Sequence, residues 1–377
     1  MGQLIASDLI AAIEEYAPLV LKEGNDPTGF QIGRRDKVVK KVLVTLDVRP
    51  EVVQEAIDNE IDFIFAHHPV MFRPARNLDL SDPQNKMYAD ILTHDMTVYA
   101  AHTNLDKAQG GMNDWLAAAL ALKNVQPFNV TDYEALMKLA VFVPETHADV
   151  VRQALGQAGA GELGNYQNCS FSAEGTGRFE PQTAADPFIG QAGQAEAVTE
   201  VKIEVILPAA KKNRVLKAML AVHPYEEPAY DLIPLANQQQ PIGIGRIGQV
   251  DQPMTVRDYA QFVCETFDLT GLRLISNEPG KLVETVAVVG GDGGKFFPAA
   301  LQAKADLYIT GDVYYHTGHD MLAAGLSVID PGHHIESIVK TKMTALFEEW
   351  RQINDWQVTF IKSQQKTDPF TFIFNAK

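Results

Sequence analysis

Three short groups of histidines and carboxylates in this chain have the residue types and spacing of metal ligands. Each group follows the end of a short β-branched, apolar run that is typical of a strand. The groups are His67 with His68, then Asp106, and then His333 with Glu336. Because ligands bind outside the carboxyl ends of the strands in a mostly parallel open sheet, we expect the three groups to meet at one rim.

Together these residues form a mixed nitrogen and oxygen ligand set of three imidazoles and two carboxylates. Such a set suits zinc, iron, manganese or cobalt, and it does not suit calcium or a metal that prefers thiolates. Neighbouring side chains on a strand point to opposite faces, so His67 and His68 serve two ions more easily than they chelate one. Five ligands leave open positions on two ions, and a carboxylate such as Glu336 can bridge them. The sequence therefore predicts two divalent ions per chain and leaves their identity open.

Further polar residues near the same rim are candidates for catalysis. His102 is either a metal ligand or the residue that positions the turn carrying Asp106. Asp312 and His316 follow another predicted strand, where they are candidates for orienting the ligands or contacting a substrate. Polar capping of the following helix is an alternative explanation for this second pair.

The elements that must position these residues alternate between strands and helices in two blocks. The first block contains predicted strands at 42–47, 61–66 and 97–101 and predicted helices at 50–59, 84–94 and 112–122. The second contains predicted strands at 283–290, 306–311, 326–330 and 357–362 and predicted helices at 256–267, 296–303, 317–324 and 336–354. This alternation predicts an α/β fold with a largely parallel sheet.

The segment between the two blocks has a different pattern. Its predicted strands lie at 136–144, 198–208 and 229–235, its predicted helices at 147–158 and 210–221, and a Gly-rich polar stretch at 159–193. That order is typical of a ferredoxin-like α+β domain, and the run ANQQQP at 236–241 indicates a linker. We therefore predict one interrupted α/β domain in two lobes, 1–129 and 238–377, with an inserted domain at 130–237.

Composition is that of a soluble globular protein, and it disfavours several classes of function. The 32 basic and 48 acidic residues give a net charge of −16, which opposes binding to nucleic acids and anionic membranes. No apolar run approaches the roughly 18 residues needed to span a membrane. Cys169 and Cys264 are the only cysteines, too few for a disulfide framework, which favours a cytoplasmic location.

Two glycine-rich motifs do not meet the requirements of nucleotide-binding loops. The motif GIGRIG at 243–248 is followed by a β-like run where the dinucleotide fingerprint needs a helix, so we expect a twisted or bulged strand. The motif GGDGGKF at 290–296 lacks the first glycine and the Ser or Thr of a P-loop. No nucleophile elbow or reactive-cysteine context supports covalent catalysis.

Several motifs, taken in order, resemble a known family. They are FAHHP at 65–69, AHTNLDKAQGGMND at 101–114, VAVVGGDGG at 286–294, ITGDVYYH at 309–316, IDPGHHIES at 329–337 and TDPF at 367–370. This ordered set looks like the Nif-three-like dinuclear metal-centre proteins, also called GTP cyclohydrolase 1 type 2 homologues. The resemblance covers nearly the whole chain.

The resemblance implies two similar α/β lobes, a toroidal homohexamer and two divalent ions held by His67, His68, Asp106, His333 and Glu336. Many members place the acidic ligand four residues after the last histidine, where this chain has Ser337. Here Glu336 is three residues on, as in longer members that carry an insertion. The insertion itself, with HPYEEPAYD at 223–231, resembles CutA/PII-like modules. His223 and Glu226 in this stretch are either ligands for a regulator or metal, or structural turn residues.

Two functions of different classes fit these features, and the sequence leaves open whether the chain is an enzyme. One is a metal-dependent hydrolase acting on a nucleotide or phosphoester, since two adjacent ions activate water and stabilise charged oxygens. The other is a non-catalytic metal-binding regulator or scaffold whose inserted domain senses a ligand. The fold does not specify the substrate.

Overall fold

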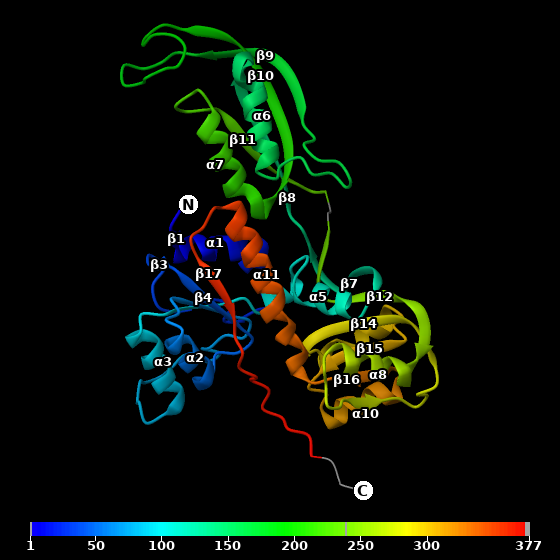
Figure 1. Cartoon of the computed structure of the whole chain (residues 1–377). Helices are drawn as coiled ribbons and strands as arrows, with labels where there is room; N and C mark the ends of the chain where they lie inside the picture. The colour runs from blue at the N-terminus through cyan, green and yellow to red at the C-terminus, as the bar shows by residue number, and fades with distance from the viewer. Residues whose placement is uncertain (1, 238–239, 374–377) are drawn as a thin grey trace. The chain divides into compact units, whose positions relative to one another are not determined.

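The computed structural model describes residues 2–237 and 240–373, and these form two compact units (Figure 1). One unit contains Met1–Thr131 and Ile242–Lys377, and the other is the inserted segment Asp132–Pro241. The insertion expected from the sequence spans 130–237. Within the expected linker at 236–241, residues 238 and 239 lie outside the described part of the chain.

The first lobe of the larger unit is built on a mostly parallel sheet. Its strands are β2 (Gly29–Ile32), β4 (Lys41–Thr45), β5 (Phe63–Ala66), β6 (Thr97–Ala100) and β17 (Thr359–Lys362). Its other elements are β1 (Leu4–Ile5), α1 (Ala6–Tyr16), β3 (Val38–Val39), α2 (Pro50–Asp58), α3 (Pro83–Thr93), α4 (Thr103–Lys107) and α5 (Met112–Ala119). The strand order is β17-β4-β5-β6-β2, with only the edge strand β2 antiparallel to its neighbour. The carboxyl ends of β4, β5 and β6 therefore lie at the same edge.

The second lobe contains a sheet of the order β13-β16-β15-β14-β12-β7. Its strands are β7 (Lys123–Tyr133), β12 (Pro241–Thr255), β13 (Arg273–Ile275), β14 (Leu282–Asp292), β15 (Leu307–Gly311) and β16 (Ser327–Asp330). Its helices are α8 (Val256–Thr266), α9 (Phe297–Gln302), α10 (Tyr315–Ala323) and α11 (Ile338–Ile353). The central strands β14, β15 and β16 are parallel, so their carboxyl ends also share an edge.

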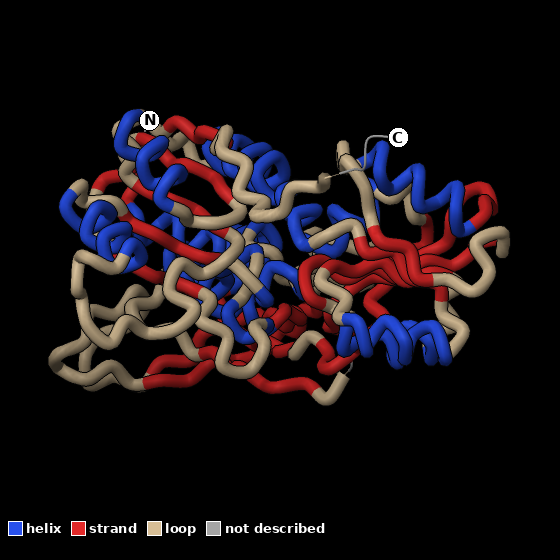
Figure 2. Tube along the Cα trace, turned by 90° about the horizontal axis from the view of Figure 1, so that it is seen from below, coloured by secondary structure: helices blue, strands red, loops and turns tan. Residues whose placement is uncertain are grey.

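Each sheet is covered by helices on both faces, as Figure 2 shows for the second lobe, where the strands lie between helices. Helices α2 and α3 cover one face of the first sheet, and α9 and α10 cover one face of the second. The remaining faces of the two sheets share a single core with α1, α5, α8 and α11. Both lobes thus have the mixed α/β architecture expected from the alternating pattern.

The inserted unit is a four-stranded antiparallel sheet with two helices. Its elements are β8 (Leu136–Pro144), α6 (Ala148–Gln157), β9 (Phe171–Phe179), β10 (Glu196–Pro208), α7 (Lys212–Val222) and β11 (Tyr230–Leu235). The strand order β11-β8-β10-β9 gives the βαββαβ arrangement of a ferredoxin-like sheet. Helices α6 and α7 pack on one face of this sheet.

Besides the short strands β1, β2, β3 and β13, which were not predicted, three strands differ from the sequence expectation or refine it. We did not predict β7, most of whose residues are exposed, because it lacks the alternation of a half-buried strand. The Gly-rich polar stretch 159–193, in which no strand was placed from the sequence, contains the strand β9, which has two glycines. The motif at 243–248 lies in β12, which has a register shift between Gln249 and Met254, as expected for an irregular strand.

Candidate metal centre

The five residues predicted as metal ligands come together in the larger unit. His67 and His68 directly follow β5, Asp106 lies in α4 after β6, and His333 and Glu336 lie in a 3₁₀ turn after β16. They form overlapping clusters whose ligand atoms lie within 4.8 Å of one another, namely His67–Asp106–Glu336, His68–His333–Glu336 and His67–His68–His102. The carboxyl ends of strands from both sheets therefore contribute to one site.

Glu336 lies at the centre of this site and is only 2% exposed. Its Oε2 is 3.1 Å from Nε2 of His68 and 3.1 Å from Nε2 of His333, while Oε1 is 3.8 Å from Nε2 of His67. Two glycines after the buried part of β14 make room for it, since a Cβ at Gly290 or Gly291 would lie 2.7 or 3.0 Å from Oε1. One carboxylate thus lies close to all three histidines.

His67 and Asp106 present lone pairs to each other without a hydrogen between them. Nδ1 of His67 is 2.7 Å from the carbonyl oxygen of Ala101, so this nitrogen carries the proton and donates it. Nε2 is consequently an acceptor, and it lies 3.5 Å from Oδ1 of Asp106. Both atoms are buried and lack a hydrogen-bond partner. Because unpaired buried acceptors are unfavourable, this arrangement fits a cation held between the two side chains.

Three aspartates orient the histidines from behind. Nδ1 of His68 is 2.7 Å from Asp47, Nδ1 of His333 is 2.7 Å from Asp312, and Nδ1 of His102 is 2.8 Å from Asp26. Each contact leaves Nε2 available to the site, as is usual for histidines that bind metals. Asp312 has a φ of +53°, a left-handed conformation that aspartate tolerates better than most residues.

The protonation of the metal-free site also indicates an affinity for positive charge. Burial disfavours the charged form of His68, but hydrogen bonds to Asp47 and Glu336 outweigh it and raise its pKa to about 10. Burial likewise opposes the charged form of His333, but its hydrogen bonds to Glu336 and Asp312 outweigh burial and raise its pKa to about 9. Burial and the charge of Glu336 raise the pKa of Asp106 to about 7, whereas the histidines keep the pKa of Glu336 well below its usual value despite burial. In the metal-free site, protons on these side chains thus compensate the negative charge that metal ions would otherwise neutralise.

The catalytic candidates have different positions. The His102 ring lies 5.3 Å from that of His67 and 5.6 Å from that of His68, so His102 borders the centre. Asp312 is placed behind His333. His316 is exposed on α10, stacks against Tyr315, and belongs to none of the ligand clusters found among the described residues. Its role in contacting a substrate stays a prediction.

Sequence reasoning missed two of the three orienting aspartates. Asp47 follows β4 and could have been found by the same strand-end rule that identified the histidines. Asp26 lies in a loop 76 residues before its partner His102, and no local pattern connects the two.

Comparison with known proteins agrees with this geometry. A family model described as Duf34/NIF3 (NGG1p interacting factor 3) matches residues 4–369. The chain belongs to this family. Among curated Duf34/NIF3 relatives, it is 44% identical over 365 residues to the "GTP cyclohydrolase 1 type 2 homolog" of Halalkalibacterium halodurans, covering 97% of this chain and 98% of the relative. It is 42% identical over 365 residues to the protein of the same name from Bacillus subtilis, with the same coverage.

Solved structures share the fold of this chain. A Bacillus cereus protein related to NIF3 has a TM-score of 0.88 at 42% identity, covering 99% of this chain and 100% of the other. A Staphylococcus aureus protein has a TM-score of 0.72 at 28% identity, with the same coverage. Within the described residues, no helix is both long enough and apolar enough to cross a membrane.

Proposed function

We propose that this Duf34/NIF3 protein holds a dinuclear divalent metal centre and hydrolyses a nucleotide or another phosphoester. The observation that carries the proposal is the pair of buried acceptors, Nε2 of His67 and Oδ1 of Asp106, which face each other without a donor. Their surroundings add an ionised carboxylate, Glu336, in contact with two further imidazoles. The donor set suits zinc, iron, manganese or cobalt.

The clusters suggest how the ligands divide between two ions. His67, Asp106 and Glu336 would hold one ion, and His68, His333 and Glu336 would hold the other. When bound, such a pair of ions supplies a water nucleophile at neutral pH and stabilises charge on the attacking and leaving oxygens.

The residues of the chain would orient the ligands and handle protons. Asp47 and Asp312 hold the rings of His68 and His333 by their Nδ1 atoms, so that each Nε2 faces Glu336. His102 is held in the same way by Asp26, and it borders the clusters without being needed in either ligand triad. We therefore assign His102 the role of moving a proton at its Nε2 atom during hydrolysis.

Metal analysis followed by activity assays tests this function. Dialysed protein should retain two divalent ions per chain, and protein loaded with each candidate metal should hydrolyse at least one member of a panel of nucleotides and phosphodiesters. His102→Gln should keep the ions and lose most of the activity. A stoichiometry below two would contradict the dinuclear centre, and full activity of His102→Gln would contradict its proton-transfer role.

A non-catalytic regulator or scaffold is the second candidate, because the inserted unit contains a large cavity of its own, about 1050 Å³ in volume. We propose that this unit is a CutA/PII-like module, on the basis of its βαββαβ strand order. Metal-loaded protein that retains both ions and turns over no substrate in the panel would favour this candidate.

We further propose assembly into a toroidal homohexamer in the cytoplasm, with a small molecule or nucleotide as the substrate. The family resemblance supports the assembly, and the two unpaired cysteines, Cys169 and Cys264, suit a reducing compartment. Sedimentation velocity of the purified chain tests the hexamer, and a single species with the mass of a monomer or dimer would contradict it.

A further inference from the structure

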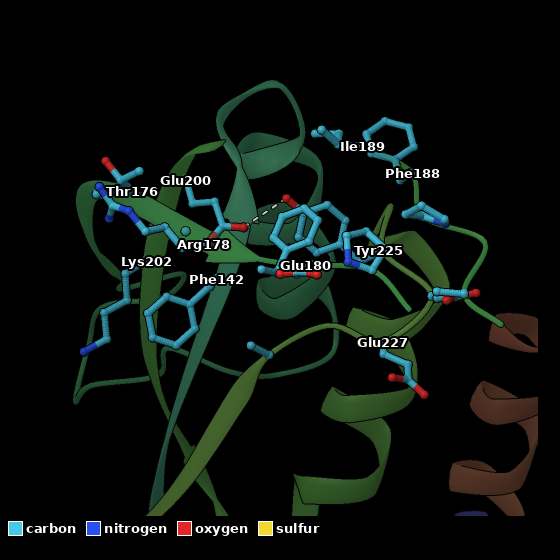
Figure 3. A pocket seen from close by; sticks show the side chains of 18 of the residues that line it. Phe142, Thr176, Arg178, Glu180, Phe188, Ile189, Glu200, Lys202, Tyr225 and Glu227 are labelled. Carbon is cyan, nitrogen blue, oxygen red and sulfur yellow. Dashed lines mark hydrogen bonds between the residues drawn. The ribbon is translucent and has the colours of Figure 1, made fainter. Parts of the chain in front are cut away.

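We propose that the cavity in the inserted unit binds a small organic cation, whose ammonium group pairs with Glu200 and whose apolar part lies against aromatic rings. This inference is independent of the metal centre. The cavity is formed by β8, β9 and β10 together with the loop after β9 and the turn after α7, and we call it the Glu200 cavity (Figure 3). Its volume of about 1050 Å³ is sufficient for a small organic ligand.

Glu200 is a charged residue on the open face of the sheet, yet it is only 8% exposed. Its neighbours on β10, Val201 and Ile203, pack in the core with α6 and α7. Because side chains alternate along a strand, the side chain of Glu200 points to the other face of the sheet, the one that the helices do not cover. A buried carboxylate is unfavourable unless it is paired, so this position calls for donors or a cation.

Glycines on the neighbouring strand make room for this carboxylate. Gly175 pairs directly with Glu200, and nothing lies within 4 Å of the place where its Cβ would be. A Cβ on Gly177 would lie only 2.2 Å from Oε2 of Glu200, so the carboxylate lies over Gly177. Glycine within a strand often marks a close approach of another group. Here it accommodates Glu200 and leaves space beside it.

Aromatic side chains line the cavity, and one of them contacts the carboxylate. The hydroxyl of Tyr225 donates to Oε1 of Glu200 at 2.9 Å, as the dashed line in Figure 3 shows. The ring of Tyr225 lies 5.9 Å from that of Phe179 and 6.4 Å from that of Phe188. Phe142 also lines the cavity. Aromatic faces around a carboxylate are the usual surroundings of a bound organic ammonium group.

The turn after α7 builds one wall of the cavity. His223 donates from Nε2 to the carbonyl of Phe142 and accepts the backbone N–H of Tyr225 at Nδ1. Glu226 accepts the backbone N–H of Asp186 and so holds the loop after β9. Both residues therefore have structural roles, in agreement with the second of the two explanations considered from the sequence.

The charges of the lining favour a cation over a phosphate. The lining contains five glutamates and two basic residues, namely Glu174, Glu180, Glu200, Glu226, Glu227, Arg178 and Lys202. Lys202 is already paired with Glu204, at 2.6 Å. A phosphate-bearing ligand would meet this excess of negative charge, whereas an ammonium group would be attracted by it.

Three probes of matched shape test the inference on the full-length protein. Phenethylammonium carries the proposed cation, 2-phenylethanol is its neutral counterpart, and 3-phenylpropanoate is its anionic counterpart. Isothermal titration calorimetry should show that phenethylammonium binds at least tenfold more tightly than the alcohol, and that the anion does not bind. Equal affinity for the three probes, or preference for the anion, would overturn the proposal.

Two variants and a control locate the binding site. Glu200→Gln keeps an oxygen that accepts the Tyr225 hydroxyl and should weaken phenethylammonium binding at least tenfold. Phe188→Ala changes a half-exposed ring on the loop and should weaken binding severalfold, so it gives an independent test if Glu200→Gln folds poorly. Glu162→Gln makes the same chemical change at an exposed position of the same unit, paired with Lys211, and should leave binding unchanged.

An alternative to the organic cation is a second copy of the chain that covers this face of the sheet. In that case the unmodified protein would not bind phenethylammonium, and Glu200→Gln would change the sedimentation coefficient. That result would refute the inference. Binding of phenethylammonium with an unchanged sedimentation coefficient in Glu200→Gln would support it.

Discussion

Replacing Glu336 with glutamine should remove both metal ions. Its carboxylate oxygens lie 3.1 Å from nitrogens of His68 and His333 and 3.8 Å from Nε2 of His67. At about 4 Å and an effective dielectric constant of about 20, one pair of unit charges contributes about 4 kcal/mol. A divalent ion doubles this energy, so, since about 1.4 kcal/mol is a factor of ten, losing the charge should lower the affinity for each ion by at least about a thousandfold.

Elemental analysis after dialysis against a fixed free-metal concentration measures this effect. Wild-type protein should retain two ions per chain and Glu336→Gln close to none, whereas His67→Ala or His68→Ala should retain about one. Ser337→Ala is the matched control, because the family resemblance offers this position as the alternative place for the acidic ligand. Two ions in Glu336→Gln together with loss of metal in Ser337→Ala would refute the assignment of Glu336.

The remaining predictions concern the surroundings of the site and the stability of the fold. Asp47→Asn should lower metal affinity about 10- to 100-fold in a competitive chelator titration, while the stoichiometry at saturating metal stays the same. Since the pKa values of His68 and His333 are raised to about 10 and 9, metal uptake at pH 7 should release protons, seen with a pH indicator, and affinity should rise up to about pH 10. Arg246→Met should lower the free energy of unfolding by about 3–5 kcal/mol in urea, because it leaves a partly buried carboxylate without its partner. Burial lowers the pKa of His223, so the neutral ring stabilises the folded state fully above pH 6.5, and this stabilisation is lost as pH falls through the folded-state pKa. The melting temperature of His223→Gln should therefore depend less on pH in this range.

The convergence of the five proposed ligands could be predicted from the sequence because the rule behind it is local. Strand patterns place His67, His68 and His333 just after strands, and the topology of parallel sheets brings such ends to one edge. The same rule does not fix the direction of His316, which follows β15 near the start of α10 and is exposed. A residue just beyond a strand end is thus predictable in its position along the sheet and much less so in the direction of its side chain.

Space and long-range pairing were harder to predict. The glycines at 290 and 291 were recognised as part of a motif. The reason why glycine is needed there, namely the Glu336 oxygen next to the backbone, is visible only in three dimensions. The contact of Asp26 with His102 joins residues 76 positions apart. In the inserted unit, the glycines of β9 made a strand resemble a loop, although they make room for Glu200.

The position of the insertion explains how one chain carries a second unit without disturbing the metal centre. The chain leaves the larger unit through β7 and returns through β12, and these two strands are neighbours in the second sheet. Insertions are best tolerated where the chain ends they join lie close together. All five proposed ligands lie directly after β5, in α4 or in the turn after β16, which are outside the inserted segment. The strand ends that supply the ligands are therefore connected by the two-lobe core, and the inserted unit has its own core, which supports the proposed second binding site on the open face of its sheet.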